Sequence, residues 1–216
     1  MGFGWAVMFL GVVALALAFL YAPPEVTMGD RQRIMYFHVA SAWNAYLAFF
    51  VVFVSSILYL RKGERRWDRL ALSSAELGVF FTTMALVSGS IWGRSVWGVW
   101  WTWDPRLTTT LILWFLYLGY LLLRSGEEDP RRARLAAVLG IIGFVDVPII
   151  HMSVIWWQSL HPVVIRPGKV DMVPPMVLAL VASVFAFTAL YFYLLRWRLG
   201  LEALRERMML LRERLR

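Results

Sequence analysis

Four tryptophans lie within seven positions in the segment WGVWWTWDPRL, residues 97–107. Trp97, Trp100 and Trp101 recur at the spacing of one helix face, so a short helix here would present their rings on one side, with Trp103 pointing elsewhere. Indole faces and edges both make favourable contacts with aromatic rings, so such a surface suits a large, flat, apolar ligand. The segment therefore predicts an amphipathic, aromatic binding surface at the edge of a membrane.

An acid and a base close this segment and begin the next helix. Asp104 is a favoured N-cap residue, and Pro105 suits the first helical position because its missing N–H is not needed there. Arg106 then falls in the first turn, where the helix dipole disfavours a cation. We expect Asp104 to cap the helix and Arg106 to pair with an acid or an anionic ligand.

The three histidines are the candidate metal ligands, because the chain has no cysteine and thiolate sites are excluded. His38 lies where an apolar segment begins, and His161 lies in a loop before a proline. His151 ends another apolar segment, where we expect it to be buried and structural. Imidazole is a standard ligand of haem iron, and arginine binds carboxylates through paired hydrogen bonds. A flat, apolar, metal-centred ligand with two carboxylates describes haem, but the residues alone do not decide which two histidines would bind the iron.

The composition is that of an integral membrane protein. Hydrophobic residues make up 60% of the 216 positions and charged residues 17%, against about 25% charged in soluble domains. Segments long enough to cross a bilayer, which takes about 20 residues, are predicted at Phe3–Tyr21, Val39–Leu60, Leu70–Trp92, Leu107–Leu123, Leu135–His151 and Met172–Leu195. We expect an all-α protein with a six-helix transmembrane domain over residues 1–200. Its tryptophan-rich segment, 92–108, lies on the outer surface between helices 3 and 4, and residues 201–216 form a basic amphipathic cytoplasmic tail.

Lysine and arginine are distributed unevenly along the chain. Sixteen of the 22 lie in loops 61–69 and 124–134 and in the tail from Arg196, which places these parts and both termini in the cytoplasm. The outer segments are then 22–38, 93–106 and 152–171. All three histidines and most tryptophans lie in or next to these segments, whereas an aromatic belt alone would load both membrane faces similarly. Orientation thus explains the net charge of +8, which indicates no nucleic acid.

A membrane transporter subunit, moving haem, another solute or protons through the bundle, is the main alternative. Glu76 and Asp146 are acids within predicted spans, where ionisable residues commonly mark a transport path. Glu76 is near enough to the cytoplasmic end to reach water. Asp146 lies two residues before Pro148, which should break or kink the helix. Two isolated acids are weak support for transport, so ligand binding at the outer surface is preferred.

A membrane scaffold and a redox cytochrome are two further alternatives. An apolar stripe in the tail fits either a surface-lying helix or a docking face for a cytoplasmic partner. Its members are Leu201, Leu204, Met208, Leu211 and Leu215. A scaffold leaves the outer histidines and tryptophans unexplained. A cytochrome with paired histidines predicts ligands within the spans, whereas His38 and His161 lie at the outer edge.

Several stretches of the chain match a known family. Residues 97–108, WGVWWTWDPRLT, resemble the WWD signature of the haem-handling protein superfamily. Further matches are RIMYFHVASAW (33–43), WGRSVWG (92–98) and VPIIHMSVIWWQSLHP (147–162). These stretches, their order along the chain and the six predicted spans resemble the CcmC (haem exporter protein C) family of cytochrome c biogenesis proteins. The resemblance covers most of the chain.

The resemblance implies a protein that binds haem at the periplasmic face of the bacterial inner membrane and delivers it to the periplasmic haem chaperone CcmE. The implied partners are CcmE, the small membrane protein CcmD, the ABC-type proteins CcmA and CcmB, and membrane lipid. Binding of b-type haem would be non-covalent and transient. The role is haem transfer rather than enzymatic catalysis, although assistance with covalent attachment to the chaperone fits it.

Family positions carry over to particular residues of this chain. His38 and His161 match the two outer histidines that bind the haem iron, and no such role is carried to His151. The matching signature residues are Trp97, Trp100, Trp101, Trp103, Asp104 and Arg106. We further expect Arg106, with Arg33 or Arg94, to neutralise the haem propionates.

Overall fold

The structure, a computed structural model, describes residues 2–126, 129–157, 159–161, 165–166 and 169–214. Nearly all of these residues are helical, and they include six helices long and apolar enough to cross a membrane. The helices are α1 (Gly2–Ala16, continued by a π-helical turn at Leu17–Tyr21), α2 (Ile34–Lys62, preceded by a 3-10 turn at Asp30–Arg33), α3 (Arg65–Trp97), α4 (Pro105–Arg124), α5 (Pro130–Trp156) and α6 (Pro174–Arg214). The expectation of an all-α, multi-pass membrane protein is confirmed.

The helices extend beyond the apolar segments that predict them, because polar residues continue each helix until a stop signal. α2 ends where Gly63 has a φ of 68°, and α3 ends where Gly98 has a φ of 78°. Glycine adopts these left-handed angles without strain. α5 is capped by Asp129, whose carboxylate accepts a hydrogen bond from the backbone N–H of Arg131. It then continues through Pro148, where the sequence predicts a break or kink.

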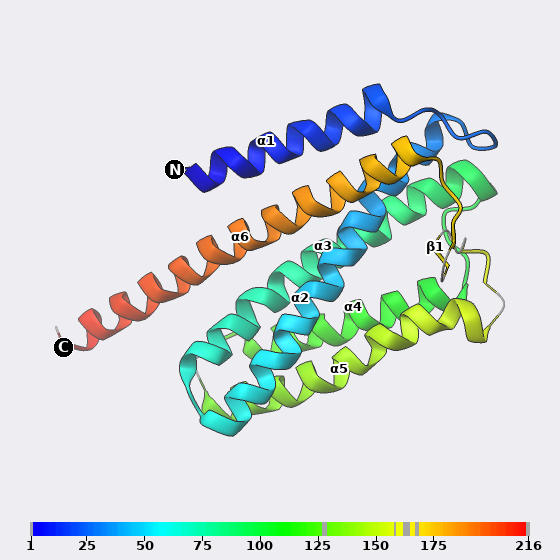
Figure 1. The fold of residues 1–216 in the computed structure, drawn as a ribbon. Helices are drawn as coiled ribbons and strands as arrows, with labels where there is room; N and C mark the ends of the chain where they lie inside the picture. The colour runs from blue at the N-terminus through cyan, green and yellow to red at the C-terminus, as the bar shows by residue number, and fades with distance from the viewer. Residues whose placement is uncertain (1, 127–128, 158, 162–164, 167–168, 215–216) are drawn as a thin grey trace.

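α2 and α3 form the centre of the bundle, with α4 and α5 packed on one side and α6 on the other, and α1 packs against α6 (Figure 1). Phe49 of α2 stacks on Tyr117 of α4, with ring centres 3.7 Å apart. A side chain at Gly78 of α3 would place its Cβ 2.4 Å from a ring carbon of Phe49. The close approach of α2 and α3 therefore requires glycine at this position.

The helix ends fall into two groups (Figure 1). The α2–α3 turn, the α4–α5 connection and both termini lie at one end of the bundle, and segments 22–33, 98–104 and the α5–α6 connection lie at the other. A small antiparallel pair, β1 (Ile165–Arg166) and β2 (Lys169–Val170), belongs to the α5–α6 connection. The three segments that the sequence assigns to one side of the membrane thus meet at one end.

Ion pairs join the helices toward the opposite end. Asp68 of α3 and Arg124 of α4 approach to 2.7 Å. Glu76 of α3 accepts two hydrogen bonds from Arg198 of α6, one of them 2.8 Å long, and Arg198 also pairs with Glu202 at 2.5 Å. Glu76, considered as a transport residue from the sequence, therefore links α3 to α6.

α6 crosses residue 200 without a break, so the tail that the sequence places from residue 201 is the continuation of this helix. Its apolar stripe is exposed at the described positions Leu201, Leu204, Met208 and Leu211. Leu215, the last member of the stripe, lies outside the described residues.

The expectation that His151 is buried is wrong. His151 is exposed, because the face of α5 that packs into the bundle at this height is the one carrying Ile150 and Ser153. Asp146, one turn earlier, is half-buried, and its Oδ2 atom has no hydrogen-bond partner within the described part of the chain. The two side chains therefore have different surroundings and form no pair.

Candidate functional site

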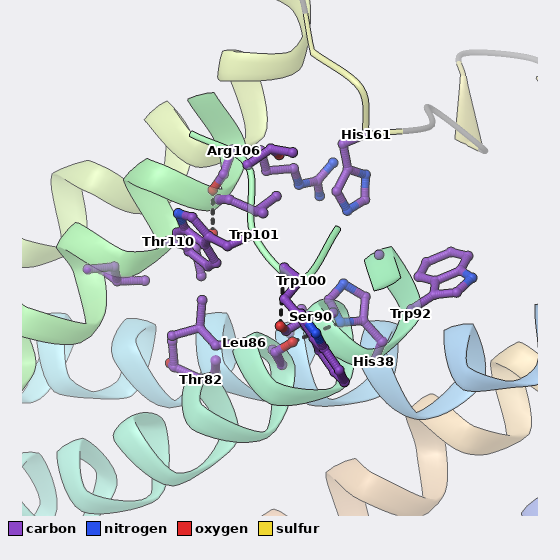
Figure 2. A pocket seen from close by; sticks show the side chains of 18 of the residues that line it. His38, Thr82, Leu86, Ser90, Trp92, Trp100, Trp101, Arg106, Thr110 and His161 are labelled. Carbon is purple, nitrogen blue, oxygen red and sulfur yellow. Dashed lines mark hydrogen bonds between the residues drawn. The ribbon is translucent and has the colours of Figure 1, made fainter. Parts of the chain in front are cut away.

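A cavity opens at the end of the bundle where the long connections meet. It is lined by α2, α3, the start of α4, segment 98–104 and His161. Binding sites for small molecules and cofactors commonly have mostly apolar walls with a few polar groups. The polar groups that reach this cavity include His38, His161 and Arg106 (Figure 2).

His38 is held in one orientation by α3. Its Nδ1 atom lies 3.0 Å from the carbonyl oxygen of Ala85 and 3.2 Å from the hydroxyl of Ser88. A carbonyl oxygen only accepts hydrogen bonds, so Nδ1 carries the proton and Nε2 presents a lone pair. A hydrogen bond from the protonated ring nitrogen to a carbonyl oxygen is the arrangement that orients histidines for binding a metal. Gly89 makes room for the ring, because a Cβ there would lie 2.9 Å from Cε1 of His38.

His161 faces His38 across the cavity. The two imidazole rings come from opposite sides, one from α2 and the other from the segment after α5 (Figure 2), with centres 6.1 Å apart and planes inclined by 31°. A metal-bound imidazole nitrogen lies about 2 Å from its metal, so two imidazoles on opposite sides of one metal have ring centres roughly 6 Å apart. The observed separation is therefore compatible with two ligands of a single metal atom.

Among the described residues, no group of three or more His, Cys, Asp or Glu side chains is arranged to hold a metal ion. Two facing imidazoles are protein ligands that would suit the iron of a haem, whose porphyrin would supply the other donors.

Indole rings form part of the cavity wall, although not through the predicted short helix. α3 ends at Trp97 because Gly98 leaves helical geometry, and residues 98–104 form a non-helical loop. This loop brings Trp100 and Trp101 beside Trp97 at the cavity, and the hydroxyl of Ser90 holds the carbonyl of Trp100 at 2.7 Å. The tryptophans therefore meet through the fold of a loop onto α3 rather than through helical spacing.

Trp103 and Trp92 occupy contrasting places. Trp103 is 76% exposed and does not line the cavity, and its ring meets Trp101 edge-on at 5.9 Å. Trp92 is buried, lines the cavity, and packs edge-on against His38 at 5.9 Å between ring centres. Trp92 thus supports one histidine directly, whereas Trp103 stands at the surface.

Asp104 is the N-cap of α4, as predicted. Its carboxylate accepts a hydrogen bond from the N–H of Arg106 at 3.0 Å. The same carboxylate accepts hydrogen bonds from the Ser159 hydroxyl at 2.9 Å and from the backbone N–H of Leu160 at 2.7 Å. Asp104 is buried and does not line the cavity, so its oxygens are committed to the protein itself.

Arg106 and Arg33 have different surroundings. Arg106 lines the cavity, where its guanidinium points toward His161 (Figure 2). Arg33 does not line it: its guanidinium bonds to the carbonyl groups of Ala18 and Ala22, the latter at 3.0 Å, and to Asp30 at 2.8 Å. The expectation that Arg33 joins Arg106 at one site is not supported, because Arg33 ties the end of α1 to the start of α2.

A profile of the family "Heme exporter protein C" (CcmC) matches residues 2–214. This chain belongs to the heme exporter protein C family. The Heme exporter protein C of Bradyrhizobium diazoefficiens is 38% identical over 189 residues, which cover 86% of this chain and 72% of that protein. That of Haemophilus influenzae is 36% identical over 197 residues, 90% of this chain and 80% of the relative. A cytochrome c biosynthesis ccmC-like mitochondrial protein of Marchantia polymorpha is 34% identical over 194 residues, 89% and 80% of the two chains.

Several cavity residues of this member of the heme exporter protein C family carry no signal in its sequence. Gly89 lies on α3, and Tyr46 and Thr82 lie deeper on α2 and α3. In an apolar helix, small and aromatic residues of this kind resemble ordinary packing positions. Only the register of α2 against α3 places them at the same cavity as His38.

Proposed function

We propose that this protein handles haem in cytochrome c biogenesis: it holds haem at the periplasmic face of the inner membrane and delivers it to the chaperone CcmE. Support comes from membership of the heme exporter protein C family and from relatives named for heme export and cytochrome c biosynthesis. The observation that carries the proposal is the pair of imidazoles 6.1 Å apart in one cavity.

Each part of the cavity has a role toward this cargo. His38, with Nδ1 committed to Ala85, offers Nε2 to the iron from the α2 side, and His161 offers its imidazole from the opposite side. Trp97, Trp100 and Trp101 provide apolar ring surface for the macrocycle. Arg106 neutralises a propionate carboxylate by charge-assisted hydrogen bonds.

Transfer requires that the cargo be held without covalent attachment and be reachable by a second protein. One proposed ligand, His38, lies on a helix, while the other, His161, lies on a connecting segment next to the exposed residues Leu160 and Trp157. A ligand on a surface segment is accessible to an incoming chaperone in a way that a ligand deep in the bundle is not. We place CcmD, CcmA and CcmB as membrane partners and assign no bond-making step to this chain.

The orientation in the membrane follows from charge. Among the described residues, fifteen lysines and arginines belong to the segments at the end of the bundle that carries the α2–α3 turn, the α4–α5 connection and both termini. By the positive-inside rule this end is cytoplasmic, so the cavity and both of its histidines open on the periplasmic side of the inner membrane.

A transfer assay tests this function. The protein is purified in detergent with bound haem, then mixed with haem-free CcmE, and the haem on each protein is measured after separation. We expect haem to move to CcmE from the unaltered protein. His38→Ala and His161→Ala should retain much less haem, whereas His151→Ala, which changes an exposed histidine of α5, should behave as the unaltered protein does. Haem that stays in place and only changes oxidation state would point to electron transfer instead.

A further inference from the structure

One carboxylate joins three parts of the site. Asp104 ends the loop that carries Trp100 and Trp101, and it caps α4, whose residues Arg106 and Thr110 line the cavity. It also accepts hydrogen bonds from Ser159 and Leu160, more than 50 residues further along the chain. Asp104 is 7% exposed. Its three hydrogen bonds therefore form in a low-dielectric setting, where bonds to a charged acceptor are strongest.

The hydrogen bonds continue from Asp104 to His161. The hydroxyl of Ser159 donates to Oδ1 of Asp104 at 2.9 Å and accepts from the backbone N–H of His161 at 3.1 Å. The backbone N–H of Leu160, the residue immediately before His161, donates to Oδ2 at 2.7 Å. The backbone on the N-terminal side of His161 is thus fixed at two consecutive N–H groups.

The two facing histidines are held by different means. His38 lies within α2 and is oriented by a carbonyl of α3, so regular helix packing fixes it. His161 lies in a connecting segment without helix or strand structure at that residue. Such a segment has to be fixed by specific hydrogen bonds if its imidazole is to meet His38 at a defined distance.

We infer that Asp104 is the positioning residue for His161: its carboxylate fixes the segment 159–161 on the start of α4, which sets the imidazole of His161 opposite that of His38. This rests on the proposed function, because it takes His161 as an iron ligand. Asp104 itself does not contact haem. Asp104, the acid of the tryptophan-rich segment, therefore acts through His161, which is distant in sequence.

The chain contains a matched control for this role. Asp104-Pro105-Arg106 begins α4, and Asp129-Pro130-Arg131 begins α5 with the same capping hydrogen bond, at 2.8 Å. The start of α5, which Asp129 caps, lies at the opposite end of the bundle from the α5–α6 connection, to which His161 belongs (Figure 1). Because asparagine is as good an N-cap as aspartate, Asp104→Asn and Asp129→Asn both preserve a helix start. Only Asp104→Asn replaces a carboxylate that accepts hydrogen bonds from the segment that carries His161.

Hydrogen exchange on the haem-free protein tests the tether directly. In Asp104→Asn, the amide of Leu160 should exchange roughly tenfold faster or more, the factor that corresponds to losing one hydrogen bond to a charged group. Ser159→Ala, which leaves the cap of α4 intact, should accelerate exchange at His161. Asp129→Asn should leave both amides unchanged. Unchanged exchange at both positions in Asp104→Asn would overturn the inference.

The spectrum of the haem-loaded protein tests the consequence for the ligand. Asp104→Asn and Ser159→Ala should shift the iron toward the spin state of His161→Ala, and added imidazole should restore the unaltered spectrum by filling the vacated position. The spectrum of Asp129→Asn should match that of the unaltered protein without added imidazole. If Asp104→Asn loses haem and imidazole does not restore it, while Leu160 stays protected, Asp104 contacts the ligand directly and the positioning role is wrong. If His161→Ala itself leaves the spectrum unchanged, it is the proposed ligand that fails, a result distinct from failure of the tether.

Discussion

Gly89 is the residue at which the smallest change should have a large effect on haem binding. An alanine Cβ at this position would lie 2.9 Å from Cε1 and 3.3 Å from Nδ1 of His38, whereas ordinary contacts begin at 3.4 Å. Relief of this overlap requires the imidazole to move by roughly half an ångström or more, since overpacking a tight site shifts its neighbours. The ring would then lose its alignment with the Ala85 carbonyl, which holds Nε2 toward the cavity.

We expect Gly89→Ala to weaken haem binding by about 10- to 100-fold. Overpacking costs about 1–3 kcal/mol, and misplacing a reacting group by about 1 Å commonly costs about 10²-fold. Alanine is a better helix former than glycine by up to about 1 kcal/mol, so the loss of affinity should exceed any loss of stability. Haem titration of the purified protein, followed by its Soret absorption, gives the affinity, and thermal unfolding in detergent gives the stability.

Gly11→Ala is the matched control. It makes the same change within α1, where a Cβ meets no atom within 4 Å, and it should leave haem affinity unaltered. Wild-type affinity in Gly89→Ala would refute the placement of His38 against α3 and, with it, the assignment of Nε2 as the atom that faces the iron.

Three further predictions concern the cavity and the bundle. Arg106→Leu should lower the affinity for haem about tenfold but leave the affinity for haem dimethyl ester unchanged. Only free propionates form charge-assisted hydrogen bonds with an arginine, which are worth about 1.5–3 kcal/mol. An equal loss of affinity for the two compounds would contradict the role of Arg106. Trp100→Ala should weaken haem binding by about tenfold or more, as expected for loss of a large aromatic contact, and Trp103→Ala should not, because Trp103 does not line the cavity. Glu76→Gln should lower the unfolding temperature in detergent without altering the haem spectrum, because Glu76 pairs with Arg198 and does not line the cavity. Loss of bound haem would show that Glu76 serves the site.

Much of the fold follows from the sequence because membrane insertion imposes simple rules. A run of about 20 apolar residues has to be helical to satisfy its backbone hydrogen bonds, and all six helices were predicted on this basis. The N-cap at Asp104 and the role of Pro105 were also predictable, since both depend on residues within one turn. Helix lengths were less predictable: α2 begins at Ile34, before its apolar segment 39–60, and α3 ends at Trp97, beyond its apolar segment 70–92.

The site itself was only partly predictable. Residue types and topology place His38, His161 and the tryptophans on one side, but local spacing gave the wrong structure for 98–104, because it does not account for the left-handed glycine that ends α3. The exposure of His151 depends on which face of α5 packs against the bundle. The separation of Arg33 from Arg106 depends on where α1 ends. These features arise from the packing of distant segments, and no local pattern encodes them.

Electron paramagnetic resonance of the ferric, haem-loaded protein, with histidines labelled with ¹⁵N, tests the central claim most directly. If His38 and His161 hold one iron between them, the spectrum is low-spin with couplings to two imidazole nitrogens, and one coupling disappears in each of His38→Ala and His161→Ala but not in His151→Ala. A high-spin iron in the unaltered protein, or two couplings that persist when either residue is replaced, would contradict the account.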